Sequence, residues 1–279
     1  YSDLPDGFQA VQYKNSQLSP RASAGLRTPK PNAEPSSITI YRNPDGGTTT
    51  SSGKLDIVHK QRHPQTGAWV TRTIRKVAPQ NNNNWSTSFY LGDPKENTTL
   101  TPYREITINR TPNADGTETT HEVSKDRATD GSMVITSDVT RKYAFYKFGE
   151  PVILSETRHS GTGSDLTTDW TYYTNSADKA SFNKPATMRR TGGQWTNTTY
   201  QGNPVTGTLV TKTVSGWKNN PAPAIGAAPD ENANRVVTEF EAKNETGTIG
   251  REEKIGGVIV SRTWGERYKA RSGELVEKS

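Results

Sequence analysis

Glycine-containing turns recur along this chain, and a threonine-rich run of alternating polar and apolar side chains follows them. Asp-Gly and Gly-Gly pairs favour the tight turns of β-hairpins, because those turns need the positive φ angles that glycine adopts readily. Six such turns predict a series of antiparallel hairpins. They read "PDGG" at 44–47, "QTGA" at 65–68, "ADGT" at 114–117, "TDGS" at 129–132, "TGGQ" at 191–194 and "IGGV" at 255–258.

The composition favours a β-sheet with a small core. Hydrophobic residues make up 29% of the chain, and adding glycine brings the apolar share to roughly 38%, below the roughly 45–50% of compact globular chains. Threonine accounts for about one residue in seven, and β-branched side chains fit strands better than helices. We therefore expect an all-β fold in which successive antiparallel hairpins form an extended curved sheet or solenoid.

The chain divides into two regions by its sequence pattern. Residues 1–36 are rich in Pro, Ser and Ala and lack periodicity, so we expect an extended N-terminal arm or linker. Residues 37–279 are expected to form a β-hairpin repeat domain, with loop insertions near 78–86 and 218–234 where the alternation stops. Two repeats read "NKPATMRRTGGQWTNTTY" (183–200) and "GREEKIGGVIVSRTW" (250–264).

Two predicted hairpins near opposite ends of the chain share a sequence, "GAWVTRTI" at 67–74 and "GVIVSRTW" at 257–264. The glycine closes a turn, the alternating residues suit a strand with two different faces, and the final Ile or Trp fills a packing position. A hairpin does not require the shared Arg-Thr. We interpret it as part of a cross-strand pair on the solvated face, at Arg72-Thr73 and Arg262-Thr263.

Charge and cysteine content narrow the classes of function. The net charge is +6, but the basic residues are spread along the chain in short clusters, which is typical of solvated strands, and we expect no nucleic-acid partner. Binding of an anionic polymer through the basic strands is a third alternative that fits the charge but lacks a concentrated patch. The absence of cysteine excludes disulfides and thiolate metal sites. No apolar run is long enough to span a bilayer as a helix. Since the chain opens "YSDLPDG", without an initiator Met or signal peptide, we expect a processed chain or an excised fragment.

An aromatic residue that leads into a turn and the next strand is a second recurrence, in "YKFGEPV" (146–152), "TYYTNSADKASFNKPA" (171–186) and "YQGNPV" (200–205). This pattern resembles the tyrosine-dipeptide (YD) repeats of Rhs-type and teneurin-like proteins. Tyr146, Tyr173 and Tyr200 stand at the aromatic position, and Gly149 and Gly202 stand at the turn. The Asp of the dipeptide is absent, and the following residues are Lys147, Thr174 and Gln201.

The resemblance covers residues 140–215 best, and reaches 240–268 and 38–77 more weakly. It implies a spiralling antiparallel β-sheet that forms shells or stalks of large secreted or cell-surface bacterial proteins, without catalysis of its own. No Rhs core signature and no aspartyl autoproteolysis motif accompanies it.

Few residues suggest catalysis or metal binding. His59 and His63 are four residues apart, but no third ligand stands near them, and His121 and His159 are isolated in the sequence. Paired carboxylates could act on glycosidic bonds, although any acidic β-protein contains such pairs. They are Glu118 with Glu122, Glu150 with Glu156, Asp165 with Asp169, and Glu252 with Glu253. Nucleotide-binding and hydrolase motifs are absent, so we expect no catalytic residues, no metal and no cofactor.

Four aromatic residues permit two interpretations. Trp69 and Trp195 each lie two residues after a turn glycine, and Tyr200 and Trp264 each lie seven residues after one. Exposed in a row, these rings could stack on sugars. Ile74 occupies the equivalent of the second position, and since Ile can replace an aromatic ring in a core but not on a sugar platform, the pattern favours packing.

We therefore expect a non-enzymatic structural or adhesive segment, such as a shell, stalk or spacer, of a large secreted or cell-surface bacterial protein. The alternative is a carbohydrate-binding module or a polysaccharide-degrading β-solenoid enzyme, with glycan stacking on Trp69, Trp195, Tyr200 and Trp264. Repeat architectures need neighbours or caps to cover their end faces. The expected partners are thus adjacent repeats of the same polypeptide or other copies of the chain, with a glycan as a further possibility.

Overall fold

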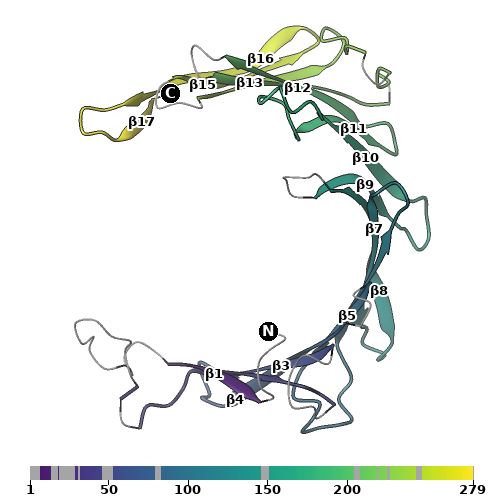
Figure 1. Cartoon of the computed structure of the whole chain (residues 1–279), viewed down its shortest axis with the longest axis vertical. Helices are drawn as coiled ribbons and strands as arrows, with labels where there is room; N and C mark the ends of the chain where they lie inside the picture. Colours follow the sequence, from purple (N-terminus) through teal and green to yellow (C-terminus); the bar gives the residue numbers. More distant parts are fainter. Residues whose placement is uncertain are drawn as a thin grey trace. The chain divides into compact units, whose positions relative to one another are not determined.

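The computed structural model describes residues 7–13, 18, 29–30, 32–45, 53–78, 83–145, 151–203, 208–218, 220–224, 227–242 and 247–278. Within these ranges the fold is all-β, with seventeen strands and no helix (Figure 1). The chain divides into two compact units. Unit 1 comprises residues 1–112 and 119–139, and unit 2 comprises residues 113–118 and 140–279. The predicted all-β fold of successive antiparallel hairpins is confirmed.

Unit 1 consists of strands that pair with their neighbours in sequence. Each of β1 to β5 is antiparallel to the next strand along the chain, and β3 and β4 form a hairpin that runs from the pair Lys54–Val77 to the pair Arg62–Trp69. The strands are β1 (Phe8–Gln12), β2 (Ser37–Arg42), β3 (Lys54–Arg62), β4 (Trp69–Val77), β5 (Asn84–Tyr90) and β6 (Arg104–Pro112). Strand β7 (Glu118–Arg127) belongs to unit 1 except for Glu118, and β8 (Met133–Ala144) continues from unit 1 into unit 2.

Unit 2 follows the same scheme. Each of β9 to β16 pairs antiparallel with the next strand, and register shifts occur in β10 and β15. The strands are β9 (Val152–Arg158), β10 (Leu166–Tyr172), β11 (Pro185–Arg190), β12 (Trp195–Asn203), β13 (Thr208–Gly216), β14 (Arg235–Ala242), β15 (Gly247–Ile255), β16 (Val258–Lys269) and β17 (Leu275–Lys278).

The strand boundaries confirm five of the six turns predicted from glycine. The turns at 65–68, 114–117, 129–132, 191–194 and 255–258 all fall between consecutive strands, and the turn at 44–47 extends beyond the described residues. Gly256 and Gly257 have φ angles of 60° and 76°. Two consecutive positive φ angles define the type I′ turn, whose twist matches that of the flanking strands.

The core is small and largely polar. Among the described residues, eight hydrophobic side chains are buried, against twelve polar or charged ones. Threonine hydroxyls join directly opposed strand positions in unit 2, at Thr171–Thr187 (2.8 Å) and Thr157–Thr167 (3.0 Å). Such cross-strand pairs stabilise a sheet whose faces are only partly covered. The accessible surface of 18132 Å² is well above the ~11,900 Å² expected of a compact monomer of this mass.

Two segments without strands pack on the sheet. Residues 91–103 connect β5 to β6 in unit 1, and the Thr73 hydroxyl donates to the Gly92 carbonyl at 2.7 Å. Residues 217–234 connect β13 to β14 in unit 2, and Lys212 on β13 forms an ion pair with Glu231 at 2.8 Å.

Two other sequence expectations concern chain regions that are only partly described. Much of the segment at 1–36 lies outside the described residues, but its described part contains β1, in which Phe8 lies opposite Tyr41 of β2. Strand β5 begins at Asn84, inside the stretch 78–86 that interrupts the sequence pattern. No helix among the described residues has the length and hydrophobicity needed to cross a membrane.

Candidate functional site

The aromatic residues considered for glycan stacking do not form a row in unit 2. Tyr200 lies opposite Thr211, and this row of partners continues across the sheet through Glu239 and Arg251 to Thr263. Trp264 follows Thr263, and because alternate residues of a strand point to opposite faces, its side chain lies on the other face from that of Tyr200. Trp69 belongs to unit 1.

Trp195 is a core residue. Its side chain is 1% exposed and packs with Val214 and Val236, and its indole N–H donates to the Asn220 carbonyl at 2.6 Å. Gly216 lies directly opposite, and a Cβ atom there would lie 2.5 Å from the indole ring. The buried ring explains why glycine occupies this position of β13, and it leaves Trp195 no face for a ligand.

Trp69 occupies the equivalent hairpin position but is 37% exposed. The guanidinium of Arg62, directly across the strand pair, lies 4.6 Å from the centre of its ring. Arg62 is itself held by the Gly67 carbonyl and Glu34, each at 2.9 Å. One face of Trp69 is therefore occupied by a cation–π contact within the protein.

Tyr200 and Trp264 differ in accessibility. The Tyr200 ring meets Tyr173 edge-on at 5.9 Å, and its hydroxyl donates to the Pro185 carbonyl at 3.2 Å. Burial raises the pKa of the Tyr200 hydroxyl. Trp264 is 43% exposed, packs on Phe240 with ring centres 4.5 Å apart, and lines a shallow pocket of about 420 Å³ with Tyr268. Of the four aromatic residues, Trp264 has the ring most open to a ligand.

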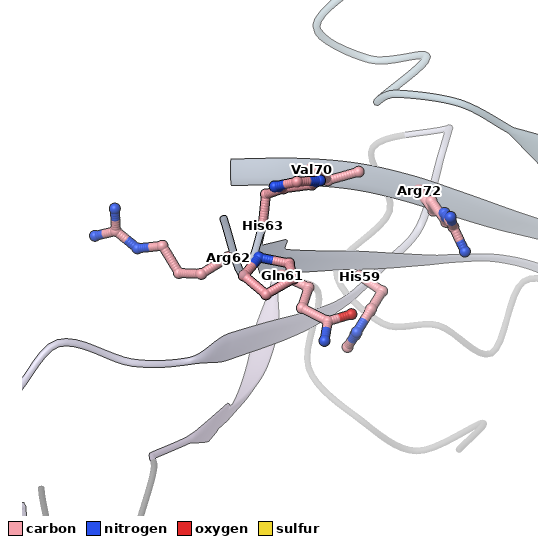
Figure 2. Close-up of a pocket in the computed structure, with 7 residues that line it drawn as sticks. His59, Gln61, Arg62, His63, Val70 and Arg72 are labelled. Atoms are coloured by element: carbon pink, nitrogen blue, oxygen red, sulfur yellow. The ribbon is translucent and has the colours of Figure 1, made fainter. Parts of the chain in front are cut away.

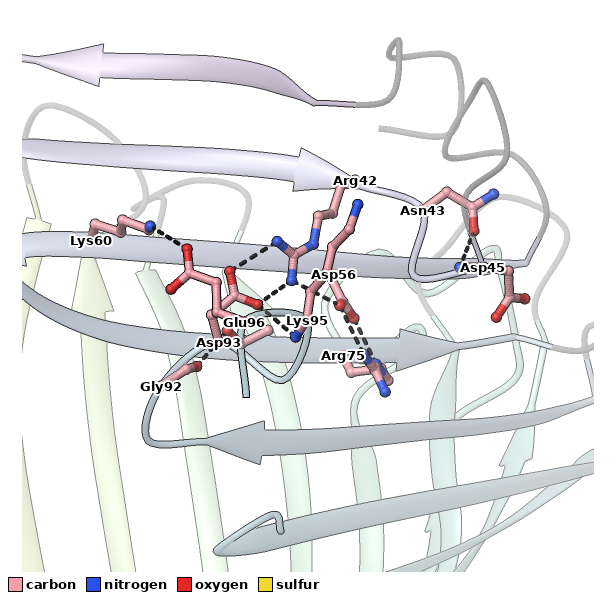
Figure 3. Close-up of polar contacts among 11 residues, drawn as sticks. Arg42, Asn43, Asp45, Asp56, Lys60, Arg75, Gly92, Asp93, Lys95 and Glu96 are labelled. Carbon is pink, nitrogen blue, oxygen red and sulfur yellow. Dashed lines mark hydrogen bonds and ion pairs between the residues drawn. The ribbon is translucent and has the colours of Figure 1, made fainter. Parts of the chain in front are cut away.

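A buried ion network, which sequence reasoning did not identify, lies in unit 1. Arg42 makes two hydrogen bonds to Asp93 and lies 3.6 Å from Asp56, and Arg75 binds both carboxylate oxygens of Asp56 at 2.7 and 2.9 Å (Figure 3). Asp56 is fully buried. The four side chains come from β2, β3, β4 and the 91–103 segment, and their charges sum to zero.

The network joins the 91–103 segment to the sheet. Burial alone would raise the pKa of Asp93, but hydrogen bonds from Arg42 and from the Lys95 backbone N–H outweigh it, so the pKa is lowered. Lys60 adds an exposed contact to Glu96 at 3.1 Å (Figure 3). Because each charge has an opposite charge in contact, the arrangement is suited to holding a loop rather than to proton transfer.

Four carboxylates from the candidate glycosidase pairs, Glu156, Asp165, Glu252 and Glu253, accept hydrogen bonds that favour the charged form. Glu156 is bound by Arg141 and Arg158, at 2.8 and 2.9 Å. Burial would raise its pKa, but these two bonds lower it. Hydrogen bonds from Lys254 and Arg262 lower the pKa of Glu252, a bond from Arg235 lowers that of Glu253, and bonds from the Ser160 N–H and His159 lower that of Asp165. A glycosidase acid requires a raised pKa. Glu150 lies outside the described residues.

A pocket of about 220 Å³ lies on the β3–β4 hairpin. His59 and Gln61 on β3 share one face with Val70 and Arg72 on β4, because His59 is directly opposite Arg72 and Gln61 is opposite Val70. Figure 2 shows these side chains together, with the Arg62 side chain extending away from them. His63 follows at the end of the hairpin, where its Nδ1 accepts the backbone N–H groups of Gln65 and Thr66 at 3.3 Å. His59 contacts the Thr39 hydroxyl at 3.1 Å.

The sequence contained one signal for this pocket, the Arg-Thr pair that the hairpin pattern did not require. The spacing of His59 and His63 in the sequence is explained by solvated strand histidines better than by metal ligands, and the register of β3 and β4 places His59 beside Arg72. No protein-family model, no curated protein and no solved structure matches this chain.

Proposed function

We propose that the chain is a non-enzymatic structural or adhesive β-hairpin segment, a shell, stalk or spacer, of a large secreted or cell-surface bacterial protein. The observation that carries the proposal is the combination of a large accessible surface with a small, polar core. Strand-to-strand hydrogen bonds, threonine pairs and surface ion pairs hold such a sheet together. These contacts suit a protein whose role is to extend and to present its surface.

The resemblance to YD repeats supports the same proposal. The predicted repeat at residues 183–200 corresponds to the hairpin of β11 and β12. The predicted repeat at residues 250–264 corresponds to the hairpin of β15 and β16. Tyr173 and Tyr200, two of the three tyrosines at the aromatic position, contact each other edge-on. Tyr146 and Gly149 lie outside the described residues.

Carbohydrate binding is the second candidate, and one observation favours it. Trp264 and Tyr268 are four residues apart on β16, a spacing that places both side chains on the same face of the strand. Both line the shallow pocket that also contains Thr248 and Lys278. Aromatic rings beside polar groups are suited to stacking on a sugar ring.

The two candidates are distinguished by binding to neutral polysaccharides, measured on an array and by pull-down with the full chain and with Trp264→Ala. Trp69→Ala is the matched control, since Arg62 already occupies one face of that ring. The structural proposal predicts no specific binding and no difference among the three proteins. Specific retention of a neutral glycan by the full chain and by Trp69→Ala, with loss in Trp264→Ala, would replace it with the carbohydrate-binding candidate.

A further inference from the structure

We propose that the pocket on the β3–β4 hairpin binds one oxyanion group, the sulfate or carboxylate of an acidic sugar, through the guanidinium of Arg72. His59, Gln61 and His63 supply further hydrogen-bond donors around it. This site is separate from the aromatic surface at Trp264 and goes beyond the structural role proposed above.

The repeated hairpin near the end of the chain provides an internal comparison. Arg262 is the counterpart of Arg72 in the shared sequence, and Glu252 lies directly opposite it. Arg262 donates to the Glu252 carboxylate through Nε at 2.8 Å and through a second nitrogen. At the same cross-strand position His59 lies opposite Arg72. The β15–β16 hairpin therefore neutralises Arg262 with a carboxylate, whereas the β3–β4 hairpin has no carboxylate opposite Arg72.

The Arg72 side chain has no hydrogen bond or ion pair within the described part of the chain, and it is exposed. No carboxylate lines the pocket. Arg62, which also lines the pocket, pairs with Glu34, and its side chain points away from Arg72 (Figure 2). Lys76 lies four positions after Arg72 on β4, on the same face of the strand, and adds positive charge. The local field thus favours an anion.

The remaining polar groups can donate hydrogen bonds toward the same space. Since the Nδ1 atom of His63 accepts two backbone N–H groups, the proton of its neutral ring lies on Nε2. Gln61 contributes a side-chain N–H₂ group, and this side chain has no hydrogen bond to another described residue. A planar guanidinium beside such donors matches the geometry of carboxylate and sulfate oxygens.

The pocket is large enough for a single charged group but too small to enclose a whole ligand. Its volume of about 220 Å³ is below the roughly 300–1,000 Å³ typical of pockets that enclose a small molecule. Nucleic acids bind through several phosphate contacts at once, whereas this pocket contains one unpaired guanidinium. A sugar that places one charged substituent in the pocket and otherwise stays in solvent fits both the small volume and the single unpaired guanidinium.

The test is NMR titration of the full chain, observing the side-chain Nε–H signals of arginine, with a sulfated disaccharide, a uronic acid disaccharide and inorganic sulfate. The Arg72 signal is expected to shift with at least one disaccharide.

Arg72→Gln and His59→Glu should weaken binding by at least about tenfold. His59→Glu places a carboxylate opposite Arg72, as Glu252 lies opposite Arg262. Arg262→Gln changes the net charge by the same amount as Arg72→Gln and should bind like the original chain. Arg72 and Arg262 are exposed and His59 is half-buried, so thermal unfolding midpoints are measured to verify that each variant is folded.

Three results would overturn the proposal. They are the absence of a saturable Arg72 shift with both disaccharides, equal weakening in Arg72→Gln and Arg262→Gln, and binding of inorganic sulfate without binding of either disaccharide. The neutral-glycan experiment is independent of these outcomes, because it depends on Trp264.

Discussion

Trp69 and Trp195 occupy the same position two residues after a turn glycine, yet only Trp195 is buried. The difference comes from segments distant in sequence. Residue Asn220, in the connection from β13 to β14, accepts the Trp195 indole N–H, and Ala222 packs against the same cluster. Trp69 instead receives the guanidinium of Arg62 from the opposite strand. A local pattern therefore predicts where an aromatic residue lies on a hairpin but does not predict what covers it.

The Asp93 carboxylate is expected to contribute stability that depends on pH. Its pKa in the folded protein is lowered, while an Asp in an unfolded chain titrates near about 3.9. The contribution is therefore fully present above that value and is lost as the pH falls through the lowered folded pKa. Asp93→Asn should reduce the free energy of unfolding at pH 7 by about 3 kcal/mol, because it leaves Arg42 buried without its charged partner. It should also flatten the dependence of stability on pH below about 4.

Urea denaturation of the full chain at several pH values measures both effects. Glu96→Gln is the matched control, since this neighbouring carboxylate is exposed and its contact with Lys60 is expected to contribute less than about 1 kcal/mol. Equal destabilisation by Asp93→Asn and Glu96→Gln at pH 7 would contradict a special role for the buried network.

At the scale of the element, the turn between β15 and β16 accepts a specific replacement. Gly256 has a φ of 60°, and a Cβ atom there would meet only the Asn232 carbonyl oxygen, at 3.9 Å. Asparagine tolerates this left-handed conformation and restricts the unfolded chain more than glycine does. Gly256→Asn is therefore expected to keep or raise the stability by up to about 1 kcal/mol.

The control for this turn is Gly256→Val. A β-branched residue at a positive φ should destabilise the hairpin by roughly 1–2 kcal/mol. Urea midpoints of both variants provide the comparison. Indistinguishable midpoints for Asn and Val would mean that the turn conformation does not limit the stability of this hairpin.

The hairpins were predictable because their signals are local. Gly67, Gly193 and Gly257 adopt positive φ angles as their turn motifs require, and the alternating runs beside them became strands. The ion network was not predictable, because Arg42 and Asp93 are 51 positions apart in the sequence and no pattern relates them. The pocket at Arg72 was predictable only in part. Its residues stand in two adjacent strands, but only the register shows that His59 faces Arg72.

At the scale of the whole molecule, the strands make most of their contacts with their neighbours in sequence. In unit 1 the pairings described join β1 through β6 in order, and in unit 2 they join β9 through β17 in order. Proteins built in this way have stabilities that approximate a sum over adjacent elements. Damage at one position should therefore remain local.

Trp195→Ala tests this locality by native-state hydrogen exchange. Removing a buried tryptophan is expected to cost about 3–5 kcal/mol, and amide protection should fall in β12, β13 and β14, whose side chains contact the ring or its neighbours. Protection in β2, β3 and β4 of unit 1 should stay at the level of the original chain.

Trp69→Ala serves as the control, since loss of its stacking on Arg62 affects an exposed contact. An equal loss of protection in both units after Trp195→Ala would show that the chain unfolds as one cooperative domain, and the description as a series of adjacent hairpins would then have to be abandoned.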